Sequence, residues 1–156
     1  SATRGIMDVV ESIEVVDATG VHTLTRAELP CAYRSGGIPR GSVIIGASLA
    51  LERTTPETVA ERMAACRQQR RALPTGYSSG CIFKNPAGAT AGRLIDQAGL
   101  KGCAVGGARV SHAHANFIIN DGRATCGDIR ALILQIKEHV RSRFGIELTE
   151  EVLIVD

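Results

Sequence analysis

Residues 79–86 have the sequence SGCIFKNP. The stretch places a thiol, an ammonium group and a carboxamide around two apolar residues, Ile82 and Phe83. Residues 81–83 predict a short strand, and the Lys-Asn-Pro sequence that follows predicts its end, because proline cannot continue a strand ladder. A core strand does not need such polar neighbours. We therefore expect chemistry here, with a proton donor on a rigid element and anion-binding groups just beyond it.

The composition is that of a globular protein with an aliphatic core. The chain has 156 residues, 44% of them apolar, enough for one domain or for one and part of a second. Aromatic residues make up only 3%, so aliphatic side chains must build the core. The 18 basic and 16 acidic side chains leave a formal charge of +2. This balance argues against a nucleic-acid groove and against a polybasic membrane surface.

Cysteine and histidine usage argues against a disulfide framework and against a metal site. The five cysteines are odd in number, and no two are spaced as C-x-x-C. His112 and His114 have no further ligands spaced to complete a metal site, so we interpret them as structural histidines. The sequence shows no signal-peptide pattern, and no apolar run approaches the roughly 18 residues of a membrane span. We expect a cytoplasmic protein that binds neither nucleic acid nor membranes.

The order of the predicted elements indicates an α+β fold. Alternating apolar residues at 9–16 and 21–24, joined by an Asp-Ala-Thr-Gly turn, predict a β-hairpin. Thr125 is placed to cap the most strongly periodic helix of the chain. Helices are expected at residues 56–71, 91–98 and 126–144. Further strands are expected at residues 42–51, 104–105, 108–110, 117–120, 146–148 and 152–155.

Three side chains are candidates for catalysis. A thiol has an ordinary pKa of about 8.5, so Cys81 would be mostly protonated at neutral pH and could donate a proton; the alternative is a buried strand cysteine. Arg34 follows Tyr33 in a glycine-rich loop, where a guanidinium could bind a carboxylate or enolate in bidentate fashion; the alternative is a surface arginine. Glu151 opens the last predicted strand, where a solvated carboxylate is the ordinary case.

Glycine-rich phosphate-binding motifs are missing from the sequence. Gly106 and Gly107 form a pair without the G-x-G-x-x-G pattern, and no P-loop occurs. The chain therefore shows no dinucleotide-phosphate cradle of its own.

Taken in order, several segments resemble the C-terminal half of the MurB family, the UDP-N-acetylenolpyruvoylglucosamine reductases. Single segments are not decisive, but their order and spacing are specific, and they extend over nearly the whole chain. They lie at residues 8–12, 33–35, 80–86, 91–95, 99–102, 106–108, 114–117, 144–148 and 151–152.

The resemblance implies a domain organisation and a reaction. Residues 73–156 would be a MurB-type C-terminal substrate-binding domain, and residues 1–72 a C-terminal remnant of the FAD-binding domain. In this family NADPH reduces FAD, and the flavin then reduces UDP-N-acetylglucosamine enolpyruvate to UDP-N-acetylmuramate, a precursor of peptidoglycan.

The resemblance also implies roles for individual residues. Arg34 matches the arginine that polarises the substrate carboxylate, and Glu151 matches the acid that assists on the same side. Cys81 matches the position, often a serine, that delivers the proton. Tyr33, Lys84 and Asn85 are expected to bind the substrate, the last two from the turn near the sugar nucleotide.

Three departures from the family pattern bear on activity. The Gly/Ser-rich flavin-phosphate loop expected upstream is absent, so we expect the chain to hold FAD weakly or not at all. Leu153 stands where many members have an arginine near the substrate, and Leu73-Pro74 replaces the commoner Gln-Pro. The alternative function is a non-catalytic UDP-sugar-binding fragment, or one that needs a partner chain carrying the missing FAD-binding portion.

Overall fold

The computed structural model describes residues 5–155, and the chain divides into two compact units, Ser1–Cys66 and Arg67–Asp156. Helix α1 (Pro56–Arg71) carries the division between them. Helices and strands are mixed as the predicted α+β class requires. The domain boundary expected between residues 72 and 73 concerns the family's domains and stays a prediction.

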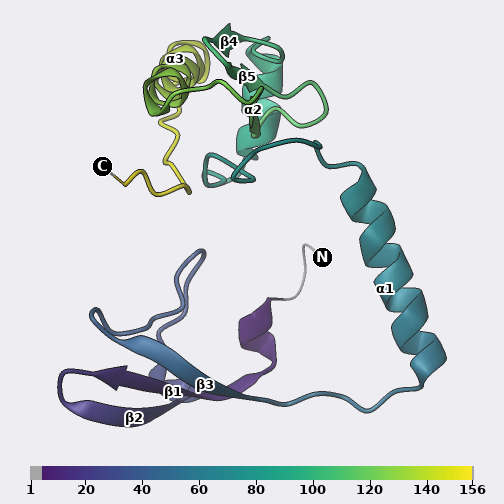
Figure 1. Cartoon of the computed structure of the whole chain (residues 1–156), viewed down its shortest axis with the longest axis vertical. Helices are drawn as coiled ribbons and strands as arrows, with labels where there is room; N and C mark the ends of the chain where they lie inside the picture. Colours follow the sequence, from purple (N-terminus) through teal and green to yellow (C-terminus); the bar gives the residue numbers. More distant parts are fainter. Residues whose placement is uncertain (1–4, 156) are drawn as a thin grey trace. The chain divides into compact units, whose positions relative to one another are not determined.

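The first unit is built on an antiparallel sheet with strand order β2-β1-β3 (Figure 1). The predicted hairpin is confirmed as β1 (Val10–Asp17) and β2 (Gly20–Thr25). Its turn is stabilised by Asp17, whose Oδ1 accepts hydrogen bonds from the backbone N–H and the hydroxyl of Thr19 at 2.7 and 2.6 Å. The strand expected at 42–51 is confirmed in a shorter form as β3 (Val43–Leu49). Two 3₁₀ turns, Ile6–Asp8 and Arg26–Glu28, flank the hairpin.

One face of this sheet borders a largely apolar cavity of about 620 Å³. Ile13, Leu29, Ile44 and Leu49 contribute to its wall, and Arg34 is the charged residue in that wall. Ile44 and Leu49 remain 48% and 42% exposed, so the unit leaves part of its apolar surface uncovered.

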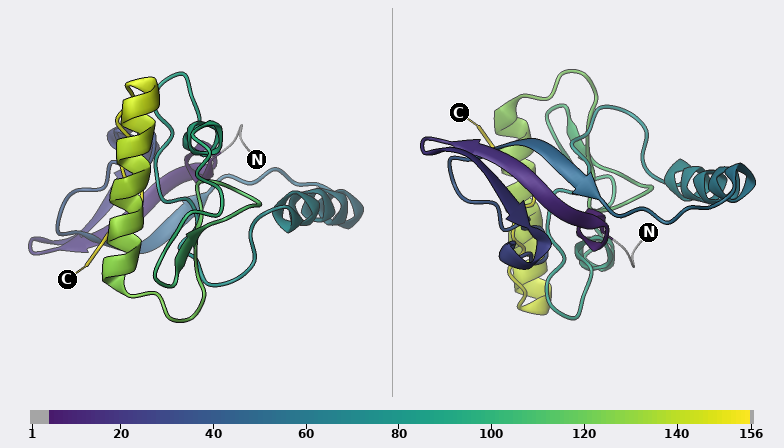
Figure 2. Two further views of the ribbon diagram at one scale, coloured as in Figure 1. Left: turned by 90° about the horizontal axis from the view of Figure 1, so that it is seen from above. Right: turned by 90° about the horizontal axis from the view of Figure 1, so that it is seen from below.

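The second unit combines a small antiparallel sheet with two helices. The sheet contains β4 (Ala104–Val105), β5 (Ala108–Val110) and β6 (Ile118–Asn120) in that order. Helix α2 (Ala91–Gln97) and the long helix α3 (Cys126–Phe144) pack with it, and α3 contacts α2, β4 and β5 (Figure 2). The three expected helices are thus confirmed, as are the short strands of this sheet.

The predicted cap of α3 is also confirmed. Thr125 Oγ1 accepts a hydrogen bond from the Asp128 N–H at 3.1 Å, and the Asp128 carboxylate accepts one from the Thr125 N–H at 2.9 Å. Gly145 ends the helix in the left-handed conformation, with φ +68°. The predicted apolar stripe is fully buried at Leu132, Ile133, Ile136 and Val140. Among the described residues, no helix is long and apolar enough to cross a membrane.

Three predicted strands are wrong. Residues 146–148 and 152–155 form no regular strand. The contacts with the stretch around Ile82 come from residues 149–152, through irregular hydrogen bonds and one isolated bridge, Phe83 to Glu150. The stretch 81–83 bends at Ile82, and its other bridge, Cys81 to Phe117, is isolated as well. The apolar residues of these segments favoured strands. Their side chains can be buried against the core without strand pairing, as Leu148 shows with only 2% exposure.

Candidate functional site

Residues 79–86, the stretch that the sequence predicts to carry chemistry, are called the site stretch here. The site stretch is hydrogen-bonded along both edges. One edge meets the segment after β5, through the bridge between Cys81 and Phe117. The other edge meets the end of the chain, where the Glu151 N–H donates to the Ile82 carbonyl oxygen over 2.7 Å. The thiol residue and the acid residue predicted to act together therefore lie on hydrogen-bonded neighbouring segments.

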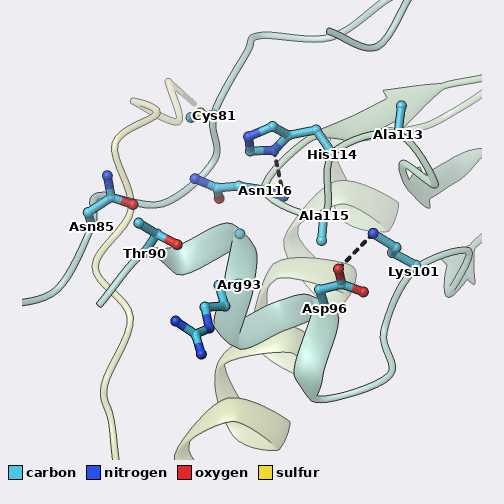
Figure 3. Close-up of a pocket in the computed structure, with 11 residues that line it drawn as sticks. Cys81, Asn85, Thr90, Arg93, Asp96, Lys101, Ala113, His114, Ala115 and Asn116 are labelled. Atoms are coloured by element: carbon cyan, nitrogen blue, oxygen red, sulfur yellow. Dashed lines mark hydrogen bonds and ion pairs between the residues drawn. The ribbon is translucent and has the colours of Figure 1, made fainter. Parts of the chain in front are cut away.

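A cavity of about 390 Å³ lies beside this stretch (Figure 3). Cys81, which is half-buried, belongs to its wall. Helix α2 contributes Arg93 and Asp96, and Asp96 forms an ion pair with Lys101 over 2.7 Å. His114 lies on another side of the cavity. Two cations against one carboxylate favour a polar ligand that carries negative charge.

The turn after the thiol is anchored by its own side chain. Asn85 Oδ1 accepts a hydrogen bond from the N–H of Ala91, the first residue of α2, at 3.0 Å. Asn85 also lines the cavity, whereas the neighbouring Lys84 is not part of its wall. The Lys84 N–H donates to the Thr149 carbonyl oxygen at 2.8 Å. The sequence thus located the turn, and the structure shows that the carboxamide helps to shape it.

The acid pair at residues 150 and 151 has two different environments. Glu150 forms an ion pair with Lys137 of α3 over 2.8 Å, with both side chains partly exposed. Partial burial of Glu150 raises its pKa, but the hydrogen bond and charge of Lys137, with a backbone hydrogen bond, outweigh it, and the pKa is lowered. Glu151 is half-buried and lies next to the site stretch. The ion pair therefore ties the segment that carries Glu151 to the helix of the core.

Arg34 and Tyr33 belong to the first unit, in a tight turn between Ala32 and Ser35. The two ends exchange backbone hydrogen bonds of 3.0 and 2.9 Å. Arg34 has φ +58°, and no other non-glycine residue at 5–155 has a positive φ. Its guanidinium lies 5.4 Å from the centroid of the Tyr33 ring. Arg34 and Cys81 belong to different units, so the joint action of the two residues that the resemblance implies stays a prediction.

His114 has structural contacts. His114 Nδ1 accepts a hydrogen bond from the Asn116 N–H at 3.2 Å, and its ring lies edge-on to Phe117 with centroids 4.9 Å apart. These contacts support the interpretation of His114 as a structural histidine, although it also lines the cavity. Across the described range 5–155, no group of three His, Cys, Asp or Glu side chains is placed to hold a metal ion.

Sequence reasoning missed two features of this site. Asn116 is buried against the site stretch and was considered only as part of a family match; a carboxamide between two apolar residues was the available signal. Arg93 gave no signal beyond its helical position.

Residues 76–80 match the hydrolase pattern G-x-S-x-G. No helix directly follows Ser78 in this described loop, so the strand-turn-helix context of a nucleophile is missing.

Comparison with known proteins assigns the family. The model of the UDP-N-acetylenolpyruvoylglucosamine reductase C-terminal domain matches residues 71–155, more than half of the chain. The chain belongs to this MurB C-terminal domain family. The match contains the whole site stretch, the cavity beside it and Glu151.

Curated MurB relatives extend the similarity into the first unit. A UDP-N-acetylenolpyruvoylglucosamine reductase from Deinococcus radiodurans is 45% identical over 135 residues, which cover 86% of this chain and 47% of the relative. One from Geobacter sulfurreducens is 42% identical and covers 96% of this chain and 50% of the relative. The chain thus spans about half the length of the curated relatives it matches. By name these relatives are oxidoreductases of the MurB type.

A solved MurB structure confirms the fold. The crystal structure of UDP-N-acetylenolpyruvylglucosamine reductase (MurB) from Thermus caldophilus matches with a TM-score of 0.82 and 37% sequence identity. The match covers 93% of this chain and 53% of that chain.

Proposed function

We propose that this chain is the substrate-binding half of a reductase that converts UDP-N-acetylglucosamine enolpyruvate to UDP-N-acetylmuramate for peptidoglycan synthesis. Membership of the family and the names of its relatives support the proposal. Within it, residues 73–156 are the C-terminal substrate-binding domain, and residues 1–72 are the end of the FAD-binding domain.

One observation carries the proposal: the 2.7 Å hydrogen bond from the Glu151 N–H to the Ile82 carbonyl oxygen. It joins the segments of Cys81 and Glu151 into one local structure, in which Cys81 lines the polar cavity. In the proposed reaction the Cys81 thiol donates a proton to the substrate carbon, which becomes negatively charged as the double bond is reduced. Glu151 assists on the same side. A thiol is a stronger acid than an alcohol, so cysteine suits this position chemically.

Arg34 is proposed to polarise the substrate carboxylate, next to Tyr33. The left-handed backbone of Arg34 supports this role, since strained residues persist where the surrounding structure holds them, often at ligand sites. A guanidinium can bind both carboxylate oxygens and stabilise charge that develops on the enolate.

Lys84 and Asn85 are proposed to bind the sugar nucleotide. Asn85 lies at the cavity, and its side chain already holds the start of α2, so its position is fixed before substrate arrives. Leu153 is 92% exposed and takes the place of an arginine found in many family members. We expect weaker binding of the substrate's anionic groups for this reason.

The hydride of this reaction is supplied in the family by FAD that NADPH has reduced. The described residues do not fit a complete FAD site. The cavity of the first unit has a largely apolar wall in which Arg34 is the charged residue, and α1 begins with Pro56 and Glu57, which disfavour an anion at its N-terminus. Two phosphates have no cradle there. We therefore assign no step of this chain to the flavin.

The alternative is a chain that binds the UDP-sugar without turning it over, or that needs a partner chain with the flavin site. Three measurements on the purified chain separate the possibilities: flavin absorbance, calorimetry with UDP-N-acetylglucosamine enolpyruvate, and NADPH oxidation. Binding without NADPH oxidation supports the alternative, and a stoichiometric yellow chain would contradict the expected weak hold on FAD. Failure to bind the UDP-sugar at all would contradict both.

A further inference from the structure

Asn116 makes an unusual set of contacts for a buried polar residue. Its side chain, in a residue only 2% exposed, accepts a hydrogen bond from the Phe83 N–H at 3.0 Å and donates one to the Phe83 carbonyl oxygen at 2.8 Å. Its own carbonyl oxygen accepts a hydrogen bond from the Ile82 N–H at 2.9 Å. One residue therefore binds three backbone groups of the site stretch.

The side-chain contacts give the backbone of Phe83 the hydrogen bonds that a neighbouring strand would otherwise supply. A carboxamide has the same donor and acceptor as a peptide group, so it can pair with both backbone groups of Phe83. Those groups are buried, and leaving them without partners would cost more than the bonds themselves contribute. The Phe83 ring is 1% exposed and adds a second anchor at the same point.

The hydrogen bonds of Asn116 to the backbone of Ile82 and Phe83, called the clamp below, lie between the residues of the proposed chemistry. Cys81 precedes Phe83 by two positions, and Asn85 follows it by two. Ile82, whose N–H binds Asn116 on one edge, accepts the Glu151 N–H with its carbonyl oxygen on the other. Movement of the backbone at Phe83 would therefore displace the thiol and loosen its link to Glu151.

We propose that Asn116 is a positioning residue, which clamps the backbone of Phe83 so that Cys81 keeps its place beside the cavity and the Glu151 segment stays hydrogen-bonded to Ile82. This inference rests on the proposed function for the chemical roles of Cys81 and Glu151. The clamp itself needs neither substrate nor flavin, and it can be tested without them.

Two substitutions separate the clamp from simple filling of space. Asn116→Leu keeps the approximate volume and removes both side-chain hydrogen bonds. Asn116→Asp keeps both only while the carboxyl group is protonated, because an ionised carboxylate has no donor for the Phe83 carbonyl oxygen. Burial raises the pKa of a carboxyl group at such a site, so the clamp of this variant should form in acid and open in alkali.

The test is the rate at which N-ethylmaleimide labels Cys81, resolved by peptide mass spectrometry and divided by the wild-type rate at the same pH. In Asn116→Leu we expect labelling of Cys81 to rise about tenfold, as for local opening after loss of buried hydrogen bonds. Asn116→Asp should resemble wild type near pH ~6 and Asn116→Leu near pH ~8.5, from the expected rise in carboxyl pKa.

Cys103 and Asn120 provide matched controls in the same unit. Cys103 is partly buried against the core, so a parallel rise in its labelling would report loosening of the whole core. Asn120 Oδ1 accepts two backbone hydrogen bonds away from the site stretch, at 2.8 and 3.0 Å, so Asn120→Leu should leave Cys81 labelling unchanged.

Two results would overturn the inference. One is a Cys81 labelling ratio that does not change with pH in Asn116→Asp. The other is parallel labelling of Cys81 and Cys103, which would make Asn116 a residue of the core alone; the pH series applies even if Asn116→Leu fails to fold. Failure of UDP-sugar binding would refute the proposed function and leave the labelling result standing.

Discussion

The two units differ in how much apolar surface each buries by itself. In Arg67–Asp156 a continuous cluster of buried residues joins the site stretch, α2, the small sheet and α3. In Ser1–Cys66 the buried cluster is small and comprises Val10, Ile13, Val15 and Leu29. Strand β3 keeps Ile44 and Ile45 about half exposed, and Ile44 lines the largely apolar cavity.

This difference separates two kinds of evidence about function. The geometry that links Cys81 to Glu151 is a property of one unit with its own core. Arg34 depends on a unit whose apolar surface is partly open, as expected of an element that packs against further structure. The predictions below test this contrast, from the largest expected effect to the smallest.

The same side-chain truncation should have very different costs in the two units. Ile136 is 1% exposed at the centre of the second unit, whereas Ile44 is 48% exposed on β3. We expect Ile136→Ala to lower the free energy of unfolding by about 2–5 kcal/mol, because a buried cavity is created. Ile44→Ala should cost less than about 1 kcal/mol, since the side chain is half solvated. Urea unfolding monitored by hydrogen exchange in each unit would measure the loss of stability in both variants. Equal losses would refute the contrast.

The start of α3 should be sensitive to a single methyl group. Gly106 has φ +53°, and a Cβ there would collide with the Asp128 carboxylate that caps the helix. Gly145 has a similar φ of +68°, but a Cβ would meet nothing within 4 Å. We expect Gly145→Ala to cost about 1 kcal/mol from backbone strain, and Gly106→Ala to cost about 1–3 kcal/mol more from the collision. Thermal unfolding of the two variants should differ accordingly, and equal midpoints would contradict this packing.

The Lys137–Glu150 ion pair should stabilise the segment before Glu151 in a pH-dependent way. The pKa of Glu150 is lowered in the folded chain, because the hydrogen bond from Lys137 and its charge outweigh the cost of partial burial. The stabilisation is therefore present above the ordinary glutamate pKa of about 4.3 and is lost as pH falls through the lower folded value. We expect Glu150→Gln to lower the free energy of unfolding by at most about 1 kcal/mol at pH ~7. The deficit should vanish in acid, and a deficit that persists below pH ~3 would contradict the assignment.

The apolar face of the first unit should show itself in dye binding rather than in stability. Ile44→Ser removes an exposed apolar group from the wall of its cavity. We expect reduced fluorescence of a bound anilinonaphthalene dye and a stability change within about 0.5 kcal/mol. Leu134→Ser on the exposed side of α3, where Leu134 is 65% exposed, is the matched control and should leave the dye signal unchanged.

Much of the fold was predictable because the deciding signals are local. The hairpin follows from alternation and an Asp-Ala-Thr-Gly turn, and α3 follows from its apolar stripe and from the cap at Thr125. The failures are non-local. Residues 146–148 and 152–155 have strand-like composition, but the hydrogen bonds to the site stretch come from residues 149–152 and are too irregular to form a ladder.

The candidate site was predictable in part for the same reason. Cys81 and Asn85 stand out in an eight-residue stretch, and both reach the cavity. Asn116 lies 33 positions from Phe83, and no local sequence pattern predicts that its side-chain amide pairs with the backbone of Phe83. The left-handed conformation of Arg34 was likewise invisible, since arginine has no preference for it.

The most direct test of the account uses a protein in which this chain is joined to a flavin-binding portion. The reduction of the bound flavin by NADPH and the formation of UDP-N-acetylmuramate are measured in wild type, Cys81→Ser and Cys81→Ala. We predict unchanged reduction by NADPH in all three, and product formation slowed by about 100-fold or more in Cys81→Ala but retained in part in Cys81→Ser, because only serine can still donate a proton. Product formation at the wild-type rate in Cys81→Ala, or loss of flavin reduction in that variant, would contradict the role of Cys81.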